Sequence, residues 1–294
     1  MPSILPQLVI NGLIAGAIYA LAASGFSLIY YVVKFQYFSH GAIMSIAAYA
    51  FFAFLNLMGL NYIVAGILTV ILAILATLST NFLVYLPLRK RKATPIVTLV
   101  SSILVLMFAS SLILSIFGAG TKSISLGAKT RIFDFGIFTI TSIQTSIILS
   151  AIILFIFLWL VLKKTRLGKA MRALADNKDV AQIVGINPEK IYTFTFIIAA
   201  LLGAIGGILL GIEQNLYPRM GVLIIVKGFV SSVVGGLGSV PGAIIGGLFI
   251  GLAENLGIWF LPSSYKDVIS FSVMLIFLLF RPQGILGVKM RDDN

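Results

Sequence analysis

The sequence predicts an all-α, polytopic transmembrane helix bundle of eight to nine spans. Of its 294 residues, 60% are hydrophobic and only 10% are charged, and the mean hydropathy is +1.10. Soluble domains carry about 25% charged residues, so a water-soluble core does not account for this composition. The apolar runs are continuous rather than alternating, which favours helices over a β-barrel.

Nine apolar runs are candidate spans, because a helix needs about 20 apolar residues to cross the hydrocarbon. The seventh and ninth are shorter, and about 21 Å of helix does not cross a core about 30 Å thick, so the seventh is a candidate re-entrant segment. Together the runs predict one membrane domain over residues 1–294. They lie at approximately 8–31, 41–58, 62–86, 96–117, 144–162, 191–212, 222–236, 240–260 and 267–280.

Basic residues predict the orientation of these spans. If the cluster 89–92, the segment 163–190 and the C-terminal tail all lie inside, the chain has an outer N-terminus, an inner C-terminus and nine crossings. Fifteen Lys and Arg residues then lie inside and five outside, in line with the positive-inside rule. The loop 118–143 fits the positive-inside rule least well. The alternative topology has eight crossings with one re-entrant pair.

The segment 163–190 is a polar stretch between two apolar runs, and it holds seven of the 21 basic and three of the nine acidic residues. We expect a helix of two turns here, capped by Asp176 with Asp179 at its third position. Gly185 is expected to end that helix in the left-handed conformation, and Ala181 to lie on its apolar side. Such a folded element predicts docking to a soluble partner; an ordinary inner loop is the alternative.

After this helix the motif Asn187-Pro188-Glu189 predicts a new helix. Asn is a favoured cap, Pro is accommodated in the first turn, and Glu is stabilised by the helix dipole. Farther along, the run 235–247 is too rich in glycine for a straight helix, and a break is expected near Gly235–Pro241.

Two charges, Lys227 and Glu254, fall inside apolar runs, where a charge is costly and is usually paired or faces a polar cavity. We expect them to pair across a helical hairpin as a structural ion pair, in preference to a substrate contact. A second polar group, Gln36, Ser39 and His40, follows the first apolar run. It is a candidate lining of a pathway, and the alternative is a span boundary in contact with water and headgroups.

No residues predict catalysis in this chain. There is no nucleophile–base pair, no pair of catalytic carboxylates and no GxxxxGK[ST] phosphate loop, and with no Cys and a single His no metal cluster is expected.

The sequence resembles the branched-chain amino acid permeases of bacterial and archaeal ABC importers along nearly its whole length. NGLIAGAIYALAASGFSLIYYVVKFQYFSHGAIMSIAAY resembles their opening, and RLGKAMRALADNKDVAQIVGINPEKI is similar to their cytoplasmic coupling segment. KGFVSSVVGGLGSVPGAIIGGLFIGLAEN and YKDVISFSVMLIFLLFRPQGILG resemble their closing stretch. Within the family the chain looks like the shorter of the two permease subunits.

This resemblance implies a multi-pass permease in the cell membrane of a bacterium or archaeon, paired with a second permease subunit. It implies two ATP-binding subunits inside, an extracytoplasmic substrate-binding protein, and alternating access driven by ATP that the partner subunits bind. This chain would bind no cofactor. Urea, amides or other amino acids are alternative substrates, and an ion-coupled secondary transporter or a channel is an alternative class. The coupling residues that the resemblance implies lie in 163–190: Asp176, Asn177, Asp179, Ala181, Gly185 and Asn187.

Overall fold

The computed structural model describes residues 4–125, 131–134, 136 and 138–287. In order along the chain, the helices and strands are α1 (Ile4–Val33), α2 (Ser39–Phe52) with a π-helical extension (Ala53–Leu57), α3 (Tyr62–Thr80), a second π-helical turn (Asn81–Tyr85), α4 (Leu86–Lys90), α5 (Pro95–Phe117), β1 (Ile132–Asp134), β2 (Thr139–Thr141), α6 (Ser142–Lys164), α7 (Arg166–Asp176), α8 (Lys178–Ile183), α9 (Pro188–Glu213), α10 (Met220–Gly235), α11 (Val240–Gly257), a 3₁₀ turn (Ser263–Tyr265) and α12 (Lys266–Phe280).

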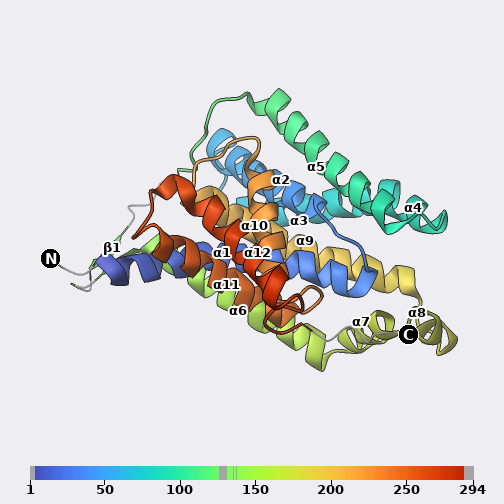
Figure 1. Cartoon of the computed structure of the whole chain (residues 1–294). Helices are drawn as coiled ribbons and strands as arrows, with labels where there is room; N and C mark the ends of the chain where they lie inside the picture. Colours follow the sequence, from blue (N-terminus) through green and yellow to red (C-terminus); the bar gives the residue numbers. More distant parts are fainter. Residues whose placement is uncertain (1–3, 126–130, 135, 137, 288–294) are drawn as a thin grey trace.

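The described residues form a helical bundle, as the composition predicts (Figure 1). Eight helical stretches are long and apolar enough to cross a membrane, and α10 is a shorter apolar helix of 16 residues. α4, α7 and α8 lie at one end of the bundle, and the start of α1 and β1 at the other (Figure 1). The basic cluster 89–92 and the segment 163–190 therefore share an end, which we call the inner end; its membrane side remains a prediction.

The long helix α1 lies at the centre of the bundle and contacts α6, α9, α10 and α11. It packs most closely on α11, through glycines on both helices. A Cβ on Gly251 would lie 2.3 Å from the backbone nitrogen of Gly16, and one on Gly247 would lie 2.5 Å from the Cα of Ala20. Only glycine permits so short a distance between two backbones, which is how spaced small residues act in membrane helices.

The outer faces of α3, α5, α6 and α12 are largely exposed and apolar, as expected of helices that face lipid or another subunit. On the end opposite the inner end, β1 and β2 pair as a short antiparallel hairpin in the loop before α6.

The glycine-rich run between α10 and α11 forms a tight turn. Gly236 and Gly238 have φ values of 113° and 82°, which favour glycine, and Ser239 caps α11 by accepting a hydrogen bond from the backbone N–H of Gly242 at 3.2 Å. Gly238 packs on the ring of Tyr30, near the inner end of α1. α10 therefore ends near the level at which α1 ends, but at 16 residues it is shorter than the eight helical stretches that could span a membrane, and whether it crosses or re-enters stays a prediction.

Candidate functional site

The polar segment at the inner end contains two helices rather than one. α7 begins at Arg166, where Thr165 accepts a hydrogen bond from the backbone N–H of Gly168 at 3.0 Å, and its apolar residues Met171 and Leu174 are buried against the bundle. Gly168 lies so close to the end of α6 that a Cβ there would come within 2.3 Å of the Leu162 carbonyl oxygen. Sequence reasoning missed α7, although its apolar residues recur at the helical spacing of three and four.

Asn177, not Asp176, caps α8. The Asn177 side chain accepts hydrogen bonds from the backbone N–H groups of Asp179 and Val180 at 3.0 and 3.1 Å. Asp176 is instead the last residue of α7, and the chain becomes extended only at Asn177. The predicted cap was therefore wrong by one residue, because a helix that ends at Asp176 had not been foreseen.

The end of α8 has the glycine turn that the sequence indicates. Gly185 has a φ of 87°, and the N–H of Ile186 donates to the Ala181 carbonyl at 2.9 Å, which closes the turn. Asn187 then accepts hydrogen bonds from the backbone N–H groups of Glu189 and Lys190, and only the four residues 184–187 separate α8 from α9.

Of the coupling residues that the resemblance implies, Ala181 does not offer its side chain to a partner. Ala181 is buried against the rest of the chain, with an exposure of 2%. The exposed apolar residues are Val180 at 54%, Ile183 at 84% and Val184 at 70%, and we call these three the α8 apolar edge. A six-residue helix that exposes such residues into an otherwise charged region is a candidate contact for another protein.

An ion pair fixes the segment that follows α8. Arg89 of α4 donates to Glu189 at 2.8 Å and to Asn81 at 3.0 Å, and its guanidinium lies over the ring of Tyr192 at 5.3 Å. The pair links α4 to the first turn of α9. Sequence reasoning did not find it, because the two residues are 100 positions apart.

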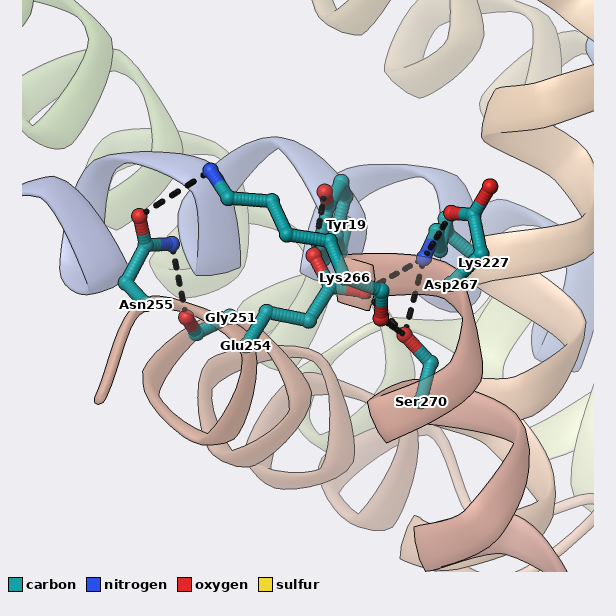
Figure 2. A network of polar contacts seen from close by, with 8 residues as sticks. All are labelled: Tyr19, Lys227, Gly251, Glu254, Asn255, Lys266, Asp267 and Ser270. Carbon is teal, nitrogen blue, oxygen red and sulfur yellow. Dashed lines mark hydrogen bonds and ion pairs between the residues drawn. The ribbon is translucent and has the colours of Figure 1, made fainter. Parts of the chain in front are cut away.

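The intramembrane charges Lys227 and Glu254 belong to a polar network within the bundle, between α1, α10, α11 and α12 (Figure 2). Lys227 pairs with Glu254 at 2.5 Å and with Asp267 at 2.6 Å, and it donates to the Ser270 hydroxyl at 2.8 Å. Tyr19 donates to the other oxygen of Glu254 at 2.9 Å, and Ser270 also donates to Glu254.

This network gives Glu254, which is fully buried, hydrogen bonds from Lys227, Tyr19 and Ser270. The contacts fit a structural role for the pair, which is the role that the sequence favours. Tyr19, Asp267 and Ser270 were missed; Asp267 and Ser270 lie one helical turn apart in α12 and bring both side chains to the same face.

Of the polar residues that follow α1, Ser39 and His40 are fully buried and Gln36 is partly buried. The Ser39 hydroxyl contacts that of Tyr85 and donates to the Ser102 carbonyl at 2.9 Å. His40 fills the space between α1 and α9. A Cβ at Gly25 would lie 2.4 Å from its ring. Ser39 and His40 therefore do not lie at a boundary with water and headgroups, and in this conformation they pack helices together.

The whole chain is similar to permeases. Residues 8–278 match the family described as branched-chain amino acid transport system / permease component. The chain is 34% identical to the high-affinity branched-chain amino acid transport system permease protein BraD of Pseudomonas aeruginosa, over 96% of this chain and 95% of the relative. It is 32% identical to the probable branched-chain amino acid transport permease protein LivH of Methanocaldococcus jannaschii, over 92% and 89%.

These matches place the chain in the branched-chain amino acid permease family, as the sequence motifs predict. It is a multi-pass membrane permease. Among solved structures, it is similar to PsaBC from Streptococcus pneumoniae in complex with Fab, with a TM-score of 0.51 and 14% identity over 93% of this chain and 91% of that one. At this identity, the likeness concerns the fold alone.

Proposed function

We infer that this chain is the membrane-spanning subunit of an ABC importer that carries leucine, isoleucine and valine into a bacterial or archaeal cell. The observation that carries this inference is the extent of the similarity. Branched-chain amino acid permeases match over 92% to 96% of the chain, whereas the ribose permease RbsC of Haemophilus influenzae matches over only 47% and the galactofuranose permease YtfT of Escherichia coli over 64%.

In this proposal, the chain binds no ATP itself, and ATP binding and hydrolysis belong to two partner subunits at the inner end. A second permease subunit completes the membrane part, and a binding protein delivers the amino acid from outside. Alternating access then requires that ATP-driven closure of the partner subunits shift the equilibrium between inward-facing and outward-facing arrangements of the spans.

The α8 apolar edge is the surface that we assign to the ATP-binding subunit. It combines exposed Val180, Ile183 and Val184 with caps at both ends, so the docking element is ordered before it binds. A preordered contact loses less conformational entropy on binding than a loop that must fold. Asp179 and Gln182 are exposed beside this edge and would form its polar rim.

The test is ATP hydrolysis by the complete complex reconstituted in vesicles, with the binding protein and one candidate substrate at a time. Leucine, isoleucine and valine should stimulate hydrolysis and accumulate inside, whereas urea, amides, ribose and polar amino acids should not. Stimulation by urea or an amide alone would still support an ABC importer but would show that its substrate is not a branched-chain amino acid. Uptake that continues without ATP and follows an ion gradient would contradict the importer itself.

A further inference from the structure

A pocket lies at the inner end of the bundle, where α6 meets α7. Its volume is about 300 Å³, and its lining comes from α1, α6, α7, the turn before α11 and the first residues of α11. Phe155, Leu158 and Trp159 of α6 form one wall, and Pro241 and Ile244 of α11 contribute to the lining as well.

The lining changes from apolar to basic along α6. Phe155 and Lys163 both line the pocket and are eight residues apart, which is about 12 Å along a helix. Lys163, in the last turn of α6, and Arg172 of α7 both line the pocket, and Arg172 also donates to the carbonyl of Leu162. The pocket therefore combines apolar walls on the bilayer side with two cations at the inner boundary.

Charge and position identify the class of ligand. Between residues 163 and 176 there are five basic residues and one acidic residue, Asp176, so the local potential is positive. Trp159 is half exposed one turn before Lys163, as aromatic residues are at the boundary of a bilayer. Basic pockets beside membrane helices on the inner side suit anionic headgroups.

We propose that this pocket binds one anionic glycerophospholipid of the inner leaflet. Lys163 and Arg172 would contact its phosphate, and an acyl chain would lie along Phe155, Leu158 and Trp159. A soluble anion would use only the basic end of the pocket and leave its apolar wall uncovered. The ATP-binding subunit is assigned to the exposed residues of α8, which do not line the pocket.

A bound lipid would connect α6, α7 and the start of α11. α7 leads directly into α8 through Asn177 alone. Occupancy would therefore brace the helix that carries the α8 apolar edge, and this effect is independent of which substrate the chain transports.

The sequence offers a direct probe, because Trp159 and Trp259 are the only two tryptophans. In a Trp259→Phe background, Trp159 reports on lipid at the pocket. The full chain is reconstituted in phosphatidylcholine vesicles in which a minority of the lipid is either brominated phosphatidylglycerol or brominated phosphatidylcholine. Bromine quenches tryptophan fluorescence on contact, so the ratio of the two quenching curves gives the preference for the anionic lipid.

The preference should be at least roughly fivefold, since each basic side chain near an anionic surface contributes about that factor. Lys163→Gln should reduce it roughly fivefold, whereas the matched control Lys190→Gln, an exposed basic residue at the same end, should leave it unchanged. Equal quenching by both lipids would overturn the proposal, as would loss of the preference on addition of inorganic phosphate. Absence of quenching by either lipid would also overturn it, because a second protein chain would then cover the pocket.

Discussion

Removal of Lys227 should be the most damaging single change in the intramembrane network. Lys227→Met leaves the Glu254 carboxylate buried, with a side-chain exposure of 1% and only the Tyr19 and Ser270 hydroxyls as donors. Removing one partner of a buried ion pair costs about 3–5 kcal/mol, because the other charge is left uncompensated. We expect a loss of this size in the free energy of unfolding.

The structure predicts that removing each of the three charges costs a different amount of unfolding free energy. Glu254→Gln leaves Lys227 in contact with Asp267 at 2.6 Å and with Ser270 at 2.8 Å, so its cost should be smaller, about 1–3 kcal/mol. Asp267 has a side-chain exposure of 62%, and water screens its interaction. Asp267→Asn should therefore cost about 0–1 kcal/mol.

The double variant tests whether the effects of Lys227 and Glu254 on stability depend on each other. Lys227→Met with Glu254→Gln removes both charges, and the introduced amide can keep the bonds to Tyr19 and Ser270, so the double variant should be more stable than Lys227→Met alone. Each variant is unfolded reversibly in mixed micelles with increasing sodium dodecyl sulfate and followed by far-UV circular dichroism. If both single variants and the double variant were equally mild, the two residues would not depend on each other and the reasoning would be refuted.

Other changes test the inner end and the helix contacts. Ile183→Asp should abolish co-purification with the ATP-binding subunit while stability stays within about 0.5 kcal/mol, since the side chain is 84% exposed; unchanged co-purification would remove α8 as the docking element. Ala181→Trp should instead destabilise the chain itself, measurable as a lower melting temperature before any partner is added. Gly25→Ala should cost about 1–3 kcal/mol by forcing a Cβ against the His40 ring, and His40→Ala should relieve it. A cysteine at Lys169 should be protected from an impermeant thiol reagent in intact cells, and rapid labelling would reverse the proposed orientation.

Composition and hydropathy were sufficient to predict the class of fold, because the bilayer imposes a length and a polarity on every span. Turn chemistry was also readable: the Gly235–Pro241 break, the left-handed Gly185 and the Asn187 cap all lie where local rules place them. These features depend on the conformation of only a few consecutive residues, which the sequence carries directly.

Contacts between distant segments were harder to predict. The Lys227–Glu254 pair was expected because each charge stands alone in an apolar run, but its partners Tyr19 and Asp267 belong to other helices. Ala181 lies on an apolar side of α8, as expected, but that side faces the rest of the chain and not a partner. A short helix with apolar residues on both sides does not reveal which side is buried, and α7, which contacts α8, had not been foreseen.

The contacts around α8 make it a rigid extension of the bundle rather than a tethered loop. Ala181 is buried on one side, and only residues 184–187 separate α8 from α9. α9 is held at its start by Arg89 and Glu189, and farther along a Cβ on Gly207 would lie 2.2 Å from the Met44 carbonyl oxygen of α2. A displacement applied at the α8 apolar edge must therefore move α9 or break these contacts. Because closely packed interfaces shift between discrete arrangements instead of deforming continuously, this is the geometry that an alternating-access mechanism needs at its inner end.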